Sequence, residues 1–148
     1  MRSRLPKVLH ALAGRPILEH VLNASRRLNP ERLVVVIGHG GDQVRQMLDS
    51  PDITWVRQEQ QLGTGHAVRC ALPALEGLDG ELMVLNGDHP LIQFETLEKL
   101  HREHQQKQRS VTLLTTTIIP PTGYGRIIRD DAGSLLRIVE EKDADEQI

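Results

Sequence analysis

Residues 58–67 read Gln58-Glu59-Gln60-Gln61-Leu62-Gly63-Thr64-Gly65-His66-Ala67, between an apolar run at 53–56 and an apolar-periodic segment at 67–75. This order predicts a strand, a glycine-bearing loop and the start of a helix, which is where α/β proteins bind ligands. Gly63 and Gly65 let the backbone approach a bound group, and free amides at a helix N-terminus favour an anionic or acceptor-rich ligand. Because short Gly-x-Gly patterns are common, a plain strand-to-helix turn without a ligand is the alternative.

Length and composition argue against several classes of protein. The 148 residues suit one domain, and the net charge of −2 gives no electrostatic case for nucleic acid or a membrane surface as the main partner. Since the chain has only one Tyr, one Phe and one Trp, aromatic platforms for stacking bases are not expected either. Cys70 has no second cysteine to pair with, which favours a reducing compartment and a cytoplasmic protein.

The rest of the chain alternates between strand and helix patterns. The segments 32–37 and 81–86 each hold a continuous apolar run without alternation, which is typical of central strands covered on both faces. We also expect helices at 16–28, 42–49 and 95–106 and one ending at Leu75, strands at 53–57 and 110–119, and a hairpin at 126–140. The predicted fold class is α/β, a three-layer αβα sandwich around a Rossmann-like, mostly parallel sheet, with a hairpin near the C-terminus. The helix at Pro16 has no strand before it, so we expect the first strand of the sheet to be lacking.

A second informative site is Gly87-Asp88-His89-Pro90, directly after the expected strand at 81–86. A carboxylate past the C-terminal end of a central strand lies at the crevice where such sheets hold ligands, so Asp88 is a candidate ligand for a divalent cation bound to phosphate. An Asp that only shapes the turn is the equal alternative. A zinc site is a weaker alternative, in which Asp88 would be joined by His39, His66 and His89.

Five short motifs follow one another along the chain. They are Leu5-Pro6-Lys7-Val8-Leu9, Gln58 with Leu62-Gly63-Thr64-Gly65-His66-Ala67, Gly87-Asp88-x-Pro90, Pro121-Thr-Gly-Tyr-Gly-Arg126 and Ile138-Val139-Glu140-x-Lys142-Asp143-Ala144. Each motif is weak alone, but in this order they resemble the sugar-nucleotide pyrophosphorylases of the MobA-like NTP transferase family. The match is similar to the uridylyltransferase domain of the bacterial bifunctional enzyme that makes UDP-N-acetylglucosamine, and it covers nearly the whole chain.

The resemblance implies a nucleotidyltransferase that forms UDP-N-acetylglucosamine and pyrophosphate from UTP and N-acetylglucosamine 1-phosphate, with Mg²⁺ as cofactor. In-line attack on phosphorus needs a cation and a lysine more than a general base. By resemblance the site residues are Lys7 and Asp88 for catalysis, Asp88 for the metal, Lys7, Gln58, Gly63 and Thr64 for the nucleotide, and Asn86, Gly125 and Glu140 for the sugar. The Gln58 amide both donates and accepts hydrogen bonds, as a uracil edge requires. Many relatives have Tyr at the position of Asn86, so contacts beside Asp88 can differ.

The chain departs from that family at both ends. Its Met1 aligns with the last residue of a family loop of the form Leu-Ala-Ala-Gly-x-Gly-Thr-Arg-Met, and the family domain continues past Ile148 into an acetyltransferase half. We therefore expect a partial nucleotidyltransferase domain over 1–148 that is inactive by itself, and a homotrimer only if the acetyltransferase half were present. Two alternatives stay open: a non-catalytic module that binds sugar nucleotides, and a pyrophosphorylase of the same fold with another base or sugar.

Overall fold

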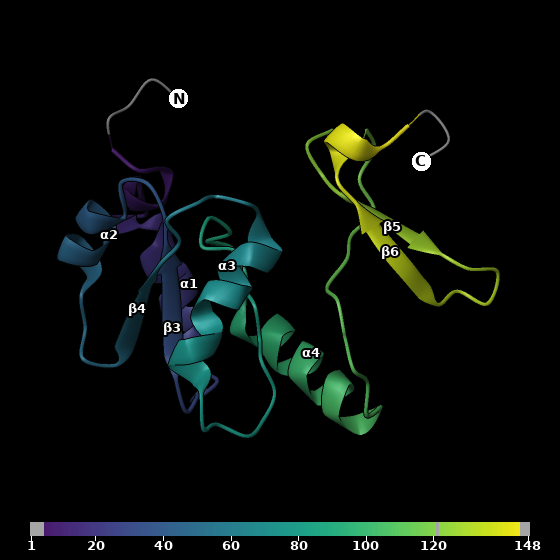
Figure 1. Cartoon of the computed structure of the whole chain (residues 1–148), viewed down its shortest axis with the longest axis horizontal. Coiled ribbons are helices and arrows are strands. Elements are labelled where there is room, and N and C mark those ends of the chain that lie inside the picture. The colour runs from purple at the N-terminus through teal and green to yellow at the C-terminus, as the bar shows by residue number, and fades with distance from the viewer. Residues whose placement is uncertain (1–4, 121, 146–148) are drawn as a thin grey trace. The chain divides into compact units, whose positions relative to one another are not determined.

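The computed structural model describes residues 5–120 and 122–145, so Met1, Pro121 and Ile148 lie outside the described residues. The chain divides into two compact units, the first ending at Thr112 and the second beginning at Leu113 (Figure 1). Across the described ranges, no helix is both long and apolar enough to cross a membrane.

The first unit combines helices with short strands, as the α/β prediction requires. Its elements are a 3₁₀ helix (Lys7–Leu9), β1 (Ala11–Leu12), β2 (Arg15–Pro16), α1 (Ile17–Arg26), β3 (Leu33–Ile37), α2 (Gly41–Leu48), β4 (Ile53–Arg57), α3 (Thr64–Ala71) with a 3₁₀ extension (Leu72–Leu75), and α4 (Phe94–Gln106). The helices and strands predicted up to residue 75, and the helix predicted at 95–106, are confirmed to within a few residues. Helix α1 stops two residues before the predicted Leu28, and the predicted end at Leu75 is reached by the 3₁₀ extension of α3.

Strands β3 and β4 form a parallel pair, in register from Leu33 opposite Ile53 to Ile37 opposite Arg57. A parallel pair needs a crossover connection, and helix α2 supplies it. Gly40, with φ of 73°, turns the chain into this helix in the left-handed region that glycine adopts without strain. The pairing continues past β4, because the backbone N–H of Gln58 donates to the Ile37 carbonyl oxygen at 2.8 Å.

One hydrophobic core joins α1 to the β3–β4 pair. Leu18, Val21 and Leu22 follow the i, i+3, i+4 spacing that brings side chains onto one face of a helix, and all three are buried. The core cluster consists of Leu9, Leu18, Val21, Leu22, Val35, Ile37, Val44 and Ile53. Because these residues come from α1, α2, β3, β4 and the preceding 3₁₀ turn, the apolar periodicity of the sequence accounts for the packing of this half of the unit.

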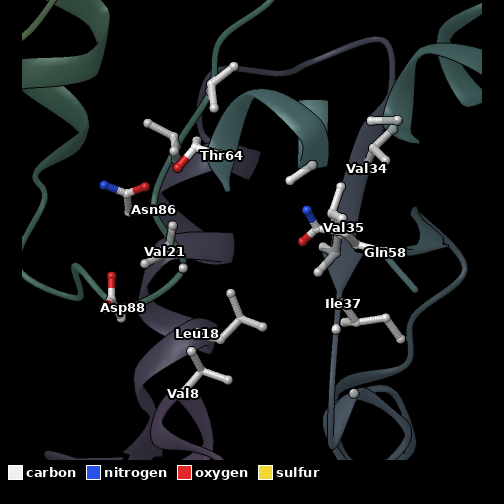
Figure 2. Close-up of a pocket in the computed structure, with 18 of the residues that line it drawn as sticks. Val8, Leu18, Val21, Val34, Val35, Ile37, Gln58, Thr64, Asn86 and Asp88 are labelled. Carbon is white, nitrogen blue, oxygen red and sulfur yellow. The ribbon is translucent and has the colours of Figure 1, made fainter. Parts of the chain in front are cut away.

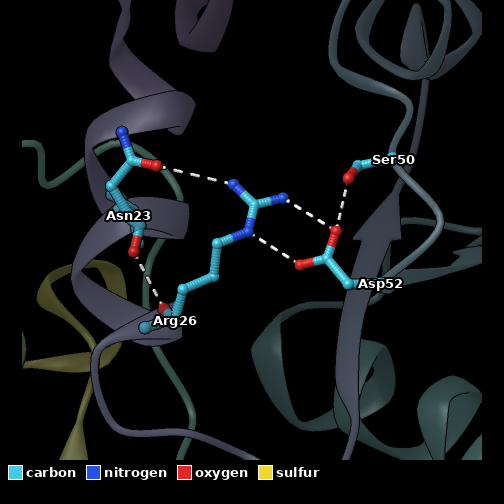
Figure 3. A network of polar contacts seen from close by, with 6 residues as sticks. Asn23, Arg26, Ser50 and Asp52 are labelled. Atoms are coloured by element: carbon cyan, nitrogen blue, oxygen red, sulfur yellow. Dashed lines mark hydrogen bonds and ion pairs between the residues drawn. The ribbon is translucent and has the colours of Figure 1, made fainter.

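A polar network joins the end of α1 to the start of β4 (Figure 3). Arg26 donates to both carboxylate oxygens of Asp52, from Nε to Oδ2 at 2.7 Å and from Nη2 to Oδ1 at 3.0 Å. The hydroxyl of Ser50 also donates to this carboxylate. These contacts hold the pKa of the Asp52 carboxyl well below its usual range, chiefly through the hydrogen bonds from Arg26 and Ser50. This bidentate ion pair ties the last turn of α1 to the residue that precedes β4.

Two predicted strands do not form among the described residues. The segments at 81–86 and 110–119 contain neither helix nor strand, and β3 pairs with β4 alone. The prediction of one sheet with 32–37 and 81–86 near its middle is therefore wrong for this structure. The physical reason is that a strand exists only where a neighbour completes its backbone hydrogen bonds, and neither segment has one.

The second unit is built on a β-hairpin, as predicted. Strands β5 (Arg126–Arg129) and β6 (Leu135–Val139) pair in antiparallel fashion, with an irregularity between Ile128 and Arg129. Asp130 closes the turn, because its Oδ1 accepts from the Ser134 N–H at 2.7 Å and its carbonyl accepts from the Gly133 N–H at 2.9 Å. A 3₁₀ turn (Glu141–Asp143) follows β6.

Candidate functional site

A pocket of ≈ 780 Å³ opens in the first unit between β3 and residues 82–88. Side chains of α1 and α3 complete its walls, and Figure 2 shows Leu18 and Val21 facing Val35 and Ile37 across it. The lining is apolar along β3 and becomes polar at Gln58, after β4, and at Asn86 and Asp88 on the other side. Predicted site residues that line this pocket are Lys7, Gln58, Gly63, Thr64, Asn86 and Asp88.

The pocket meets β3 at its edge. Successive side chains of a strand point to opposite faces of a sheet, yet every residue from Leu33 to Ile37 lines the pocket. The same is true of the consecutive residues 82–88 on the opposite side. A space lined by consecutive residues on both sides faces backbone as well as side chains, so the unpaired hydrogen-bonding groups of β3 are turned toward the pocket.

Lys7 and Asp88, 81 residues apart in sequence, form an ion pair beside the pocket. Nζ of Lys7 lies 2.7 Å from Oδ2 of Asp88, and Nε2 of His89 lies 3.7 Å from Oδ1. The hydrogen bond from the Lys7 ammonium lowers the pKa of the Asp88 carboxyl below its ordinary value, against a smaller opposing effect of burial. Asp88 is therefore a carboxylate at neutral pH, and a cationic nitrogen lies where it can meet a phosphate as well.

Gln58 lies at the opposite side of the pocket, directly after β4 and near the loop that leads into α3. Its Nε2 donates to the carbonyl oxygen of Gly63 at 3.1 Å and contacts Nδ1 of His66 at 2.9 Å. Gly63 has φ of 98°, a conformation that favours glycine, and no atom lies within 4 Å of where a side-chain carbon would sit. Thr64 opens α3 and is exposed, so its backbone amide belongs to the first turn, whose N–H groups have no helical partner.

The donor set at Asp88 is compatible with a magnesium ion that shares its ligands with substrate. Within the described residues, no group of three or more His, Cys, Asp or Glu side chains is arranged to hold a metal, so the zinc alternative finds no support. A single ionised carboxylate beside a phosphate-binding lysine is nevertheless a common protein contribution to bound Mg²⁺, since that ion keeps waters and takes phosphate oxygens.

The predicted sugar-binding residues are divided between the two units. Asn86 is exposed and lines the pocket two residues before Asp88. Gly125 and Glu140 belong to the second unit, where they flank the open ends of the β5–β6 hairpin. A side-chain carbon at Gly125 would lie 3.3 Å from Cγ2 of Ile138 and 3.5 Å from the Val139 carbonyl oxygen, so close packing as well as any ligand requires glycine there.

Two features of the site were not predicted from the sequence. One is the direct pairing of Lys7 with Asp88, and the other is the contact of His66 with Gln58. The only sequence signal for the first was the opposite charge of the two side chains. For the second, Gln58 and His66 lie on either side of Gly63-Thr64-Gly65 in the sequence, but residue types alone do not predict how close the folded loop brings them.

A parallel strand pair, a helix that begins within a Gly-x-Gly motif and a lysine–carboxylate pair around one pocket define a nucleotide-binding α/β domain. Residues 1–145 match the family described as MobA-like NTP transferase domain, and the chain belongs to this family.

Its relatives include longer proteins. The bifunctional protein GlmU of Burkholderia mallei (strain SAVP1) is 57% identical over 144 residues, which cover 97% of this chain and 31% of that protein. The bifunctional protein GlmU of Ralstonia nicotianae (strain ATCC BAA-1114 / GMI1000) is 55% identical over 148 residues, which cover 99% of this chain and 31% of that protein. The chain thus spans 31% of the length of these curated relatives.

Proposed function

We propose that this chain carries the substrate-binding part of a nucleotidyltransferase that forms UDP-N-acetylglucosamine and pyrophosphate from UTP and N-acetylglucosamine 1-phosphate. The observation that carries the proposal is the pocket with the Lys7–Asp88 ion pair on one side and Gln58 on the other. Membership of the MobA-like family and the high identity to proteins named GlmU support it.

The proposed reaction is an in-line displacement at phosphorus. An oxygen of the sugar 1-phosphate attacks the α-phosphorus of UTP, a new P–O bond forms, and the bond to the β-phosphate oxygen breaks with its electron pair leaving on pyrophosphate. The attacking oxygen is already anionic, so no side chain has to remove a proton. Negative charge grows on the leaving group, and the ammonium of Lys7 is the protein's cation for it. Magnesium bound through Asp88 and substrate phosphates would neutralise further phosphate charge.

Specificity is assigned to two further groups of residues. Gln58, with the backbone of Gly63 and Thr64, is proposed to read the base. Asn86, Gly125 and Glu140 are proposed to hold the amino sugar, because a carboxylate accepts from sugar hydroxyls that would otherwise be left without partners. A Rossmann-like, three-layer αβα fold that lacks its first strand belongs to the same proposal, as does a cytoplasmic setting for a chain with the single Cys70.

The test combines binding and turnover on the same protein. UTP, N-acetylglucosamine 1-phosphate and Mg²⁺ are supplied, pyrophosphate release is followed, and binding of each substrate is measured by calorimetry. We expect Asp88→Asn to keep the fold and to lower any turnover by roughly a hundredfold, because the amide no longer brings a negative charge to the metal. Asp79→Asn, an exposed change on the connection before the same segment, is the matched control and should have no effect.

A non-catalytic binding module is the second candidate, favoured by one observation. Residues 81–86, which lead to Asp88, lie outside any sheet, so the carboxylate is not held by a strand. Binding of both substrates without pyrophosphate release would establish this alternative. Binding of neither substrate would overturn both candidates, and a panel of other nucleoside triphosphates and sugar phosphates would then identify a different base or sugar.

A further inference from the structure

The side-chain nitrogen of Gln58 makes two contacts at the start of helix α3. Nε2 donates to the Gly63 carbonyl oxygen at 3.1 Å and lies 2.9 Å from Nδ1 of His66. The backbone is fixed as well, because the N–H of Gln58 donates to the Ile37 carbonyl at 2.8 Å. The amide group therefore has a defined position, and only its rotation about the last bond remains to be decided.

Hydrogen-bond chemistry decides that rotation. A carbonyl oxygen can only accept, so the Gln58 atom next to the Gly63 carbonyl must be the NH₂ group. Its other hydrogen points at Nδ1 of His66, which must then accept, and the proton of the neutral ring belongs on Nε2. Nε2 lies 3.8 Å from the sulfur of Cys70, a weak acceptor one helical turn later on α3.

Both hydrogens of the Gln58 amide are thus engaged within the protein, and its carbonyl oxygen is left. That oxygen accepts no hydrogen bond from any residue in the described part of the chain, and Gln58 lines the pocket. The amide consequently offers a ligand an acceptor and no donor. This differs from the expectation that Gln58 would both donate to and accept from a base.

We propose that His66 is a positioning residue that sets base specificity by holding the Gln58 amide with its oxygen toward the ligand. The inference rests on the proposed function, in which Gln58 meets the base. Uracil carries a hydrogen on N3 and can donate to a fixed oxygen, whereas N3 of cytosine is an acceptor and is repelled by it. His66 therefore selects UTP over CTP without touching the nucleotide.

Removing His66 weakens this selection by freeing the amide. Held by Gly63 alone, the amide loses only one contact when it rotates, and the rotated form presents NH₂ to the acceptor N3 of cytosine. Asn in place of His66 branches at the same carbon as the imidazole and puts an oxygen near the position of Nδ1. Gln is one carbon longer and puts its polar atoms near the position of Nε2, so it does not replace the missing acceptor.

The test measures the ratio of the Kd values for CTP and UTP, with Mg²⁺ present, on the full chain. We expect His66→Ala and His66→Gln to lower this ratio by about fivefold, the equivalent of one neutral hydrogen bond, and His66→Asn to retain most of it. His104→Ala is the matched control, because its Nδ1 lies at the same 2.9 Å from a side-chain partner, Thr112 Oγ1, but outside the pocket. Long-range ¹H–¹⁵N NMR of the unliganded protein should find the His66 proton on Nε2.

Each outcome separates this inference from the proposed function. A wild type that prefers UTP, with the same preference in His66→Ala, overturns the role of His66 and leaves the nucleotidyltransferase intact. A proton on Nδ1, or loss of selection in His66→Asn as severe as in His66→Ala, also overturns it. A wild type that binds UTP and CTP equally contradicts selection by Gln58 and His66 together. A wild type that binds neither nucleotide refutes the proposed function, and this inference with it.

Discussion

Two segments of the first unit carry the same sequence signal and have different structures. Residues 32–37 and 81–86 each contain an apolar run and are followed by a glycine-bearing polar loop. The first forms β3, pairs in parallel with β4 and buries Val35 and Ile37. The second lies across the pocket without regular structure, and its Leu82 and Val84 remain 54% and 52% exposed. Apolar sequence creates the tendency to form a strand, but only a hydrogen-bonded neighbour realises it.

The difference also explains the character of the pocket. On the β3 side, five paired residues and a packed core hold the backbone, and the N–H of Gln58, directly after β4, continues the pairing. On the other side, Asp88 depends on the Lys7 contact and on local turns, such as the bond from the His89 N–H to the Asn86 carbonyl at 3.3 Å. In the proposed function, base recognition would therefore rest on the ordered wall of the pocket, and phosphate chemistry on the wall without a sheet.

The largest expected effect comes from removing one aliphatic side chain from each segment. Ile37 is 8% exposed and Leu82 is 54% exposed. We expect Ile37→Ala to lower the free energy of unfolding by about 3 kcal/mol and Leu82→Ala by less than about 0.5 kcal/mol. Urea denaturation with matched m-values measures both. A loss of about 2 kcal/mol or more in Leu82→Ala would mean that 81–86 packs in solution as a strand does, and the contrast between the two walls would disappear.

Sequence patterns predicted helices and strands correctly where the segment also pairs or packs with another segment close to it in the chain. The helix at 17–26, the β3–β4 pair and the 126–139 hairpin fall within reach of periodicity and turn residues, since each pairs or packs with a near neighbour in the chain. Residues 81–86 lie more than forty positions from β3 in the sequence. Residue types alone cannot predict whether such a distant segment pairs with the edge of a strand. In the same way, strand-end position pointed to Asp88 and the family resemblance pointed to Lys7, but their 2.7 Å contact is a property of the folded chain alone.

Substituting one glycine after each segment, Gly41 or Gly87, gives the second, smaller contrast. A side-chain carbon at Gly41 would lie 2.6 Å from Cβ of Ile37, whereas one at Gly87 would lie 3.1 Å from Cδ1 of Leu18. A Cβ atom cannot move without its backbone, but the tip of a leucine beside a pocket can. Alanine gains up to about 1 kcal/mol of helix propensity at Gly41, and overpacking costs about 1–3 kcal/mol, so we expect a net loss of about 1 kcal/mol there.

For Gly87→Ala we expect a loss below about 0.5 kcal/mol, because Leu18 can shift into the pocket. Thermal unfolding followed by circular dichroism compares the two variants under one condition. Equal losses at Gly41 and Gly87 would indicate that the Leu18 side of the pocket is as tightly packed as the strand side. A stabilised Gly41→Ala variant would show that helix propensity outweighs the contact with Ile37.

The smallest effects are expected from two ion pairs, Arg26 with Asp52 and Lys7 with Asp88. Hydrogen bonds from Arg26 lower the pKa of Asp52 and one from Lys7 lowers that of Asp88, in both cases from a usual value near 3.8. A carboxyl whose pKa is lower in the folded than in the unfolded state stabilises the fold above the unfolded pKa. This contribution is lost as the pH falls through the folded pKa, because the proton then binds both states. Both side chains are more than one-third exposed, at 46% for Asp52 and 36% for Asp88, so solvent weakens both contributions.

Carboxyl NMR titrations of wild type, Arg26→Gln and Lys7→Gln would compare the two pairs directly. We expect each substitution to return the pKa of its own partner toward 3.8 and to leave that of the other carboxyl unchanged. The shift should be larger at Asp52, because Arg26 binds it through two nitrogens between packed elements, whereas Lys7 reaches Asp88 through one. The stability difference between wild type and Arg26→Gln should shrink as the pH falls below about 3.8, the unfolded value. A larger shift at Asp88 than at Asp52 would mean that residues 81–88 hold their carboxylate as firmly as the sheet side holds its own.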